Sequence, residues 1–251
     1  MKKVYIILVV LMVSMISLGC EKEENILKVL TSSGYEPYEM MDKSGNLIGF
    51  DIELMEKVAE EIGVEIEWKD VDFSGIIASL QANTADAAIA GISPSPERQD
   101  MVDFSRVYFN NFTGLANYII FDSKNNFNSL EDLKGLIVGA QMGTVQADFL
   151  SKVKDEYGFE VDLRNTNAQI VEEIKTGRID ALIVESPIAI TILEANETLV
   201  SSGFESYLDD YQGLAIAFPK GSIWAEKVNQ ALIKLEENGF IHSLEEKWIK
   251  E

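Results

Sequence analysis

Apolar residues along the chain follow two spacings, one typical of amphipathic helices and the other of short buried strands. A helix over residues 51–62 is predicted between strands at 26–30 and 64–68. A second helix, through 76–80, leads to an apolar run at 87–90. The apolar face of the first helix consists of Leu54, Met55, Val58, Ala59 and Ile62. This alternation predicts an α/β fold with a parallel sheet covered by helices on both faces.

A second group of elements in the middle of the chain has the same plan. Residues 137–140 and 181–184 are predicted strands. Residues 143–146 form a predicted turn that opens a helix, and a further helix ends near Gly177. A last strand is predicted at 215–218, and it fits best if the chain returns to the first group.

The two groups share a local pattern around one strand each. Asp86 precedes the run at 87–90, Asp180 precedes the run at 181–184, and polar residues with a proline follow both runs. Two lobes of similar plan would then present polar groups at the carboxyl ends of comparable strands, where open α/β sheets bind ligands. Because α/β units resemble one another, coincidence is the alternative explanation.

The N-terminus has the pattern of an export signal. Two lysines precede an almost uninterrupted apolar run at 4–18, and a charged stretch follows Gly19-Cys20. A run this short favours a signal peptide over residues 1–19 rather than a permanent membrane span. An uncleaved signal anchor is the alternative.

Cys20 is the only cysteine, so no intrachain disulfide can form. Its place after Gly19 resembles the lipobox of bacterial lipoproteins, in which the cysteine is acylated and becomes the mature N-terminus. Ser17 and Leu18 differ from the residues that are most common in that motif. The resemblance implies a lipid anchor in the membrane, followed by a linker over residues 20–25.

Composition limits the classes of partner. The 251 residues are 47% hydrophobic, which is enough for one large domain or two small ones. Loss of Lys2 and Lys3 with the signal leaves 19 basic residues against 42 acidic ones, a net charge of −23. So acidic a surface repels phosphate backbones, and no nucleic-acid partner is expected.

A series of short motifs runs through nearly all of the mature chain. The motifs are Tyr35-Glu-Pro-Tyr-Glu39, Asp42 to Asp51, Asp72-Phe-Ser-Gly-Ile-Ile77, Ala90 to Arg98, Asp103-Phe-Ser105, Gln141-Met-Gly-Thr144, Gly177-Arg-Ile-Asp-Ala181 and Ala217-Phe-Pro-Lys-Gly221. Each motif is weak, but the ordered series resembles the bacterial extracellular solute-binding proteins of family 3. These are the polar-amino-acid receptors of ABC importers.

The resemblance implies a fold, a location and partners. The expected fold is α/β and two-lobed, of the type II periplasmic-binding-protein kind, with crossing strands near 108–113 and 210–214 as its hinge. The first lobe would comprise residues 26–112 and 211–251, and the second residues 113–210. The expected protein is an extracytoplasmic monomer without a cofactor, which passes a free amino acid to the permease of an ABC transporter.

Arg98 is the candidate cation for a carboxylate. Ser95 is a plausible N-cap and Pro96 a natural first helical residue, so Arg98 would lie in the first turn of a helix, where free N–H groups also favour an anion. Its guanidinium can bind a carboxylate through two parallel hydrogen bonds. The alternative is a surface ion pair with Asp100 or Asp103.

The resemblance gives Arg98 the α-carboxylate of the ligand, with help from the backbone N–H groups of Ser93 and Val145. Glu185 follows a buried strand and so needs a partner. It would accept the α-ammonium together with the Gly91 carbonyl and the Ser93 hydroxyl. Most family members have aspartate there, so the longer acid is a departure. The alternative for Glu185 is an ion pair with Arg178 or a solvated helix cap.

Aromatic walls and two polar positions would hold the ligand's side chain. Tyr35 and Phe73 match the family's aromatic walls, although either ring could equally belong to the core. Ser32 and Gln141 stand at positions that often select the side chain, and the overall pattern favours arginine, followed by glutamine or lysine. The candidate ligand-binding residues are Ser32, Tyr35, Phe73, Ala90, Gly91, Ser93, Arg98, Gln141, Thr144, Val145 and Glu185.

The sequence contains few residues that could serve as catalytic nucleophiles or metal ligands. The one histidine, His242, lies in a terminal helical pattern, and there is no cluster of histidines and cysteines for a metal. Two alternatives are kept: a carboxylate-dependent dehydratase on the same fold, and a ligand-sensing lipoprotein that feeds no transporter.

Overall fold

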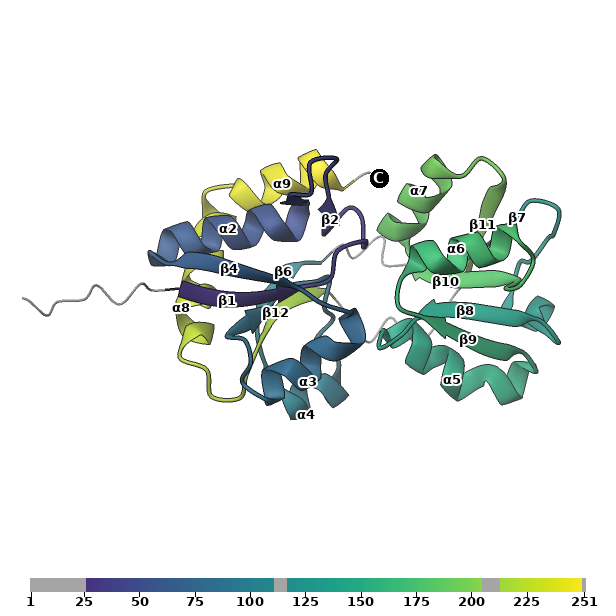
Figure 1. Cartoon of the computed structure of the whole chain (residues 1–251), viewed down its shortest axis with the longest axis horizontal. Coiled ribbons are helices and arrows are strands. Elements are labelled where there is room, and N and C mark those ends of the chain that lie inside the picture. Colours follow the sequence, from purple (N-terminus) through teal and green to yellow (C-terminus); the bar gives the residue numbers. More distant parts are fainter. Residues whose placement is uncertain (1–25, 111–116, 205–212, 250–251) are drawn as a thin grey trace, which may run out of the picture.

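Two five-stranded sheets form the two lobes of this computed structural model, which describes residues 26–110, 117–204 and 213–249 (Figure 1). The first sheet has the order β4-β1-β5-β12-β6 and the second the order β11-β7-β10-β8-β9. The strands of the first sheet are β1 (Ile26–Thr31), β4 (Glu65–Asp70), β5 (Ala87–Ala88), β6 (Asp103–Phe109) and β12 (Leu214–Phe218). Those of the second are β7 (Asn117–Asp122), β8 (Ile137–Gln141), β9 (Glu160–Arg164), β10 (Ala181–Glu185) and β11 (Leu199–Phe204).

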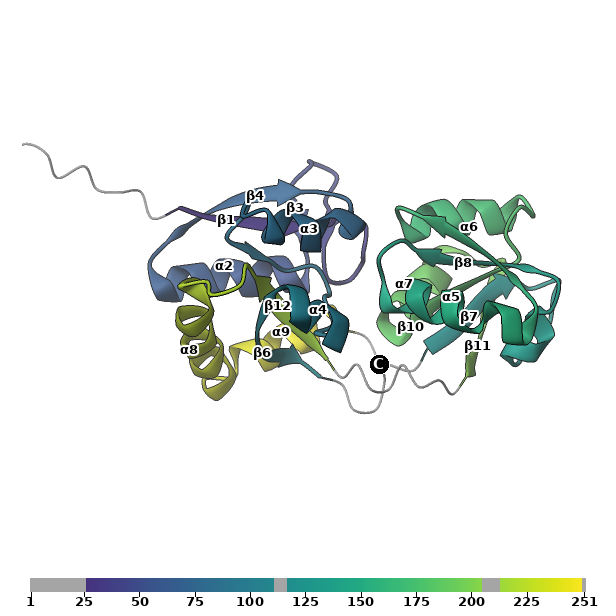
Figure 2. The same cartoon turned by 90° about the horizontal axis from the view of Figure 1, so that it is seen from below.

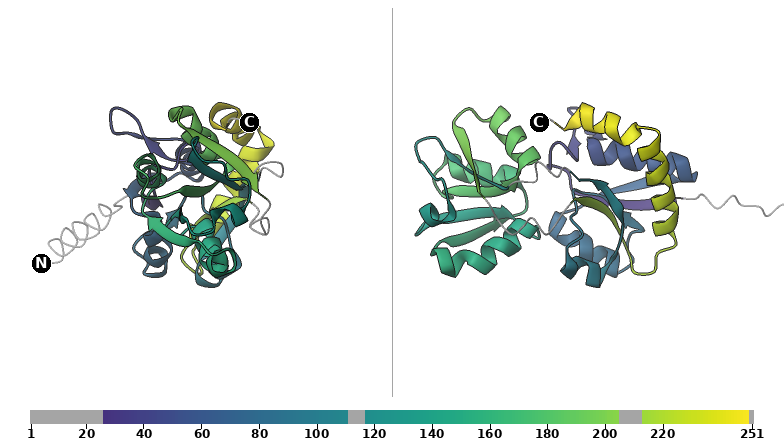
Figure 3. Two further views of the ribbon diagram at one scale, coloured as in Figure 1. Left: turned by 90° about the vertical axis from the view of Figure 1, so that its right-hand side faces the viewer. Right: turned by 180° about the vertical axis from the view of Figure 1, so that it is seen from behind.

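Helices cover both faces of each sheet (Figures 1 and 2). The first lobe carries α2 (Phe50–Ile62), α3 (Ile76–Gln81), α4 (Pro96–Met101), α8 (Trp224–Glu237) and α9 (Phe240–Trp248), with a 3₁₀ turn at Phe73–Gly75 and a small hairpin of β2 (Met40–Met41) and β3 (Leu47–Ile48). The second lobe carries α5 (Val145–Tyr157), α6 (Asn167–Lys175) and α7 (Ser186–Ala195), with a 3₁₀ turn at Leu130–Leu133. Seen from behind, the lobes lie side by side, and the C-terminal helices belong to the lobe of β1 (Figure 3).

Both sheets are mixed, so the predicted parallel pairing is confirmed for some strand pairs and wrong for others. β1 pairs in parallel with β4 and β5, and β8 pairs in parallel with β9 and β10. β12 is antiparallel to β5 and β6, and β7 is antiparallel to β10 and β11. The chain leaves the first lobe after β6 and returns to it in β12, and it enters the second lobe at β7 and leaves it after β11. Two passes in opposite directions produce the antiparallel pairs.

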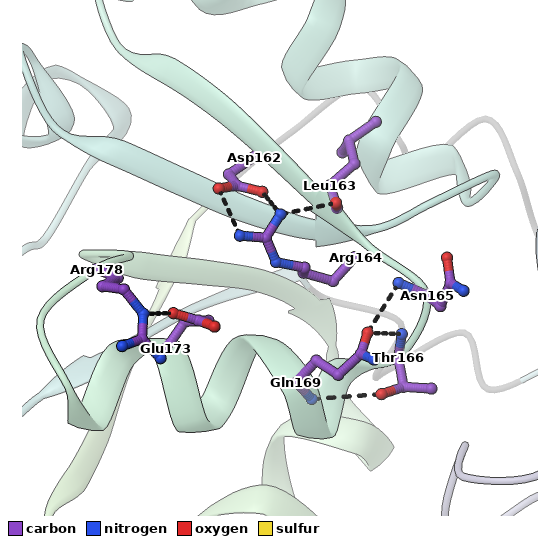
Figure 4. Close-up of polar contacts among 8 residues, drawn as sticks. All are labelled: Asp162, Leu163, Arg164, Asn165, Thr166, Gln169, Glu173 and Arg178. Atoms are coloured by element: carbon purple, nitrogen blue, oxygen red, sulfur yellow. Dashed lines mark hydrogen bonds and ion pairs between the residues drawn. The ribbon is translucent and has the colours of Figure 1, made fainter.

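Helix ends follow the local sequence. α2 ends at Gly63, which has the left-handed φ of 74° that closes a helix at little cost. Thr144 caps α5 by accepting a hydrogen bond from the Ala147 N–H. At the start of α6 the Thr166 hydroxyl and the Gln169 side chain satisfy each other's backbone N–H groups (Figure 4). These caps fix where α2 ends and where α5 and α6 begin.

Several predictions fall outside the described residues. The signal peptide, the acylated Cys20 and the linker lie in residues 1–25. The lobe boundaries and most of the two crossing segments lie in 111–116 and 205–212. Among the residues that the structure does describe, no helix is long and apolar enough to span a membrane.

Candidate functional site

A cavity lies where the two lobes meet. Its predicted lining residues are Tyr35, Phe73, Gly91, Ser93, Arg98, Thr144, Val145 and Glu185, and it is completed by Asn117, Gln146 and Leu214. The predicted residues come from segments that follow β1, β4, β5 and β8, and from the last residue of β10. The carboxyl ends of the parallel strands of both sheets therefore face one space, which is where open α/β sheets bind ligands.

Arg98 is fixed by its own turn and by both lobes. The Ser95 hydroxyl accepts a hydrogen bond from the Arg98 N–H at 3.3 Å, and Pro96 begins α4, as predicted. The guanidinium donates to the Ser93 carbonyl at 2.8 Å and to the Gly143 carbonyl of the second lobe at 2.9 Å. Only 8% of Arg98 is exposed, so the surface ion pair does not describe it.

Phe73 packs against Arg98, and Asp103 has other partners. The guanidinium carbon lies 5.4 Å from the centre of the Phe73 ring, within the range of a cation–π contact. Asp103, which could have been its ion-pair partner, is paired with Lys220 at 3.1 Å and accepts the Gly221 N–H at 2.7 Å.

Glu185 is the buried acid of the second lobe, with 7% of its surface exposed. It accepts hydrogen bonds from the Tyr35 hydroxyl and, at 2.8 Å, from the Gln146 side-chain amide. Arg178 pairs with Glu173 (Figure 4), and the Glu185 side chain caps no N–H group of α7, so neither alternative for Glu185 holds. Burial raises the pKa of Glu185, while the Tyr35 hydrogen bond and the charge of Arg98 oppose the rise.

Hydrogen bonds between described residues join the lobes at this place. Besides the bonds from Arg98 to Gly143 and from Tyr35 to Glu185, the Asn165 amide donates to Asp72 at 3.1 Å. The free space inside the cavity is about 30 Å³, room for about one or two water molecules. The lobes are therefore in direct contact around a small cavity.

Three of the predicted residues do not line the cavity. Ser32 and Ala90 are buried, Ala90 next to the lining residue Gly91, and Gln141 is buried at the end of β8. The Gln141 amide nitrogen donates to the Asn165 carbonyl at 3.0 Å. Its side-chain oxygen has no hydrogen-bond partner among the described residues.

Sequence reasoning missed Asn117, Gln146 and Leu214. Gln146 donates to Glu185 and, at 3.2 Å, to the Asn117 side-chain oxygen, so it orients the buried acid. Gln146 lies in the first turn of α5 beside the predicted Val145, and this position in the sequence could have indicated that it belongs to the site. Asn117 and Leu214 lie at the starts of β7 and β12, whose proximity to the site depends on how the chain passes between the lobes.

Comparison with known proteins agrees with this geometry. Residues 27–251 match the bacterial extracellular solute-binding proteins, family 3. The chain belongs to this family. The family 3 chain is 37% identical over 231 residues to the arginine-binding extracellular protein ArtP of Bacillus subtilis (strain 168), covering 92% of this chain and 88% of that one.

Solved structures of family 3 relatives share the fold. An ancestral arginine-binding protein bound to arginine superposes with a TM-score of 0.82 at 33% identity, over 90% of this chain and 99% of that one. An ancestral arginine-binding protein bound to glutamine gives 0.81 at 33% identity, with the same coverage. The predicted two-lobed fold is confirmed.

Family membership also decides the general function. The relatives are amino-acid-binding proteins of ABC transporters, and they are not enzymes. This family 3 protein is therefore an extracytoplasmic amino-acid-binding protein, and the dehydratase alternative is set aside. Within the described residues, no three histidine, cysteine or acidic side chains are grouped as metal ligands would be.

Proposed function

We propose that this protein captures arginine between its lobes and delivers it to an ABC importer by lobe closure. The observation that carries the proposal is a pair of opposite charges facing one cavity, Arg98 from the first lobe and Glu185 from the second. A zwitterionic ligand needs a cation for its carboxylate and an anion for its ammonium. Such a ligand would bridge the lobes and favour the closed form by contacts that the open form lacks.

In this proposal the α-carboxylate binds Arg98. The two terminal nitrogens of the guanidinium donate to the backbone oxygens of Ser93 and Gly143. The ligand's carboxylate would replace these oxygens as the acceptor of the two hydrogen bonds. The N-terminus of α5, with the Val145 N–H, would add hydrogen bonds to the same anion from the second lobe.

The α-ammonium binds Glu185 in the same proposal. Gly91 and Ser93 line the cavity, and the Gly91 carbonyl and the Ser93 hydroxyl would complete its acceptors. The Tyr35 hydroxyl, which now donates to Glu185, would give way to the ammonium. Charge-assisted hydrogen bonds favour the exchange, because they are roughly twice as strong as neutral ones.

The side chain of the ligand would lie against Tyr35 and Phe73. Phe73 already accepts one guanidinium over its face, that of Arg98, so this ring suits a second planar cation. The similarity to arginine-binding relatives supports arginine, and glutamine and lysine are the next candidates.

The proposal also includes how the protein is held outside the cell. A signal peptide over residues 1–19 would be removed, and Cys20 would carry a lipid that anchors a monomer to the membrane. Metabolic labelling with a fatty-acid analogue tests this, because Cys20→Ser should lose the label while the wild type retains it.

Ligand identity can be tested by thermal unfolding of the mature domain with each common amino acid. A ligand at 100 times its Kd stabilises the folded state by about 2.7 kcal/mol. We expect arginine to give the largest rise in midpoint. A larger rise with glutamine, lysine or another amino acid would reassign the specificity, and no response to any amino acid would overturn the proposed function.

Closure can be tested at Gly143, which lies against the other lobe. A Cβ at this position would lie 2.9 Å from the Ser74 Cα, across the lobe boundary. Gly143→Ala should therefore hinder closure and lower arginine affinity about tenfold or more, because tenfold corresponds to only about 1.4 kcal/mol. The measurement is isothermal titration calorimetry.

Gly177→Ala is the matched control for Gly143→Ala. Both glycines have a positive φ, 82° at Gly143 and 72° at Gly177, but no atom lies within 4 Å of a Cβ at Gly177. Both variants carry the backbone strain of roughly 1–3 kcal/mol, and only one meets the other lobe. Equal affinities in the two variants would argue against closure through this contact.

A further inference from the structure

Asp51 is a buried carboxylate that is linked to the ligand cavity by a hydrogen bond to one backbone group, the Gly91 N–H. It lies in the first turn of α2 and has no exposed surface. One of its oxygens accepts the Gly91 N–H at 2.7 Å, and the other accepts the Tyr108 hydroxyl at 2.8 Å. Gly91 lines the cavity, whereas Asp51 does not.

Gly91 needs such an anchor because its backbone is unusual. Its φ is 56°, in the left-handed region, and a Cβ there would lie 3.0 Å from the Tyr35 ring. Glycine is the most flexible residue, so a loop that turns at Gly91 is not held by its own backbone preferences. The 2.7 Å bond to Asp51 fixes the peptide that enters this turn.

We infer that Asp51 is a positioning residue for ligand binding, holding Gly91 so that its carbonyl faces the α-ammonium of the bound amino acid. This inference rests on the proposed function. It assigns a binding role to a side chain that never contacts the ligand, and its effect should depend on the ammonium group.

The neighbours of Asp51 determine where the negative charge lies. Burial raises the pKa of Asp51 to about 6, and the hydrogen bonds from Gly91 and Tyr108 oppose the rise. Burial, and next the charge of Asp51, raise the pKa of Glu39 well above its usual range. With a pKa of about 6, Asp51 is mostly charged at pH 7.5, so its bond to the Gly91 N–H is charge-assisted.

The test compares arginine with its desamino analogue, 5-guanidinopentanoate, which has no ammonium group. Asp51→Asn retains the size and an acceptor oxygen but loses the charge, and Asp51→Ala removes the acceptor. By calorimetry at pH 7.5, we expect Asp51→Asn to weaken arginine roughly 3- to 10-fold and the analogue less than 2-fold, since a charge-assisted bond is about twice as strong as a neutral one. Asp51→Ala should widen that difference.

Asp86→Asn is the matched control. Asp86 also accepts a backbone N–H, that of Lys28 at 2.9 Å, in the same lobe but away from the cavity. This variant should leave the ratio of the two affinities unchanged. Equal losses of both ligands in Asp51→Asn, or no loss of either, would overturn the inference. Failure of the wild type to bind any amino acid would instead overturn the proposed function. If Asp51→Ala does not fold, Asp51→Asn decides the question alone.

Discussion

Arg98→Ala should lower the affinity for arginine by roughly 30-fold to several thousand-fold. Removing one member of a buried, hydrogen-bonded charge pair costs about 2–5 kcal/mol, and each 1.4 kcal/mol is about tenfold in affinity. The alanine variant leaves the ligand's carboxylate in a closed site without its cation. It also removes the bond from Arg98 to the Gly143 carbonyl, which joins the lobes. Calorimetry on the mature domain measures the loss.

Two further variants sharpen this result. Arg98→Lys keeps the charge but not the planar fork, so it should recover only part of the affinity. Arg178→Ala is the control, because Arg178 is an exposed arginine paired with Glu173 and does not line the cavity. Affinity for arginine that is unchanged in Arg98→Ala would refute the proposed carboxylate site.

Most of the helices and several of the parallel strands could be predicted because burial leaves a local pattern in the sequence. The helix expected over 51–62 is α2 at Phe50–Ile62, and the strand expected at 181–184 is β10 at Ala181–Glu185. The run at 87–90 is shorter as a strand, Ala87–Ala88, because the chain turns away at Gly91 toward α4. Local spacing thus predicts which elements form, and it is less informative about where they end.

Strand direction could not be predicted in the same way. The apolar spacing of β12 is the same whichever way the strand runs, and its antiparallel pairing depends on the route by which the chain returns to the first lobe. The strands β7, β9 and β11 were not predicted, and only the end of β6 coincides with a predicted strand, the crossing strand near 108–113. Four of β9's five residues are only half-buried, so their alternation is weak.

The site was predictable to the extent that its residues lie at the end of a buried strand or in the segment that follows one. Arg98 and Glu185 satisfy that description, and each lines the cavity. Gln146 and Asp51 act on the site through another residue, Glu185 in one case and Gly91 in the other. A contact of this kind joins residues about 40 positions apart and depends on packing between elements, which no local pattern contains.

Glu185→Gln should weaken arginine binding roughly 30-fold or more and leave the desamino analogue within about 3-fold of its wild-type affinity. The glutamine keeps the size of the side chain but cannot offer a carboxylate to the ammonium, so only a ligand with an ammonium loses the charge-assisted bonds, each worth about 1.5–3 kcal/mol. When the analogue binds to the wild type, the Glu185 carboxylate stays buried without a cation beside it, which costs desolvation free energy. Glu185→Gln removes this charge and its cost, so tighter binding of the analogue would also agree with the proposal.

The control for Glu185→Gln is Glu173→Gln. Glu173 belongs to the same lobe and pairs with Arg178 outside the cavity, so its neutralisation should change neither affinity. Thermal unfolding without ligand separates binding from folding, because a buried acid with a raised pKa makes the folded state less stable as the pH rises through that pKa. Glu185→Gln should therefore match or exceed the wild type in unfolding midpoint at neutral pH while losing arginine. Equal losses of arginine and its analogue would show that Glu185 shapes the site without binding the ammonium.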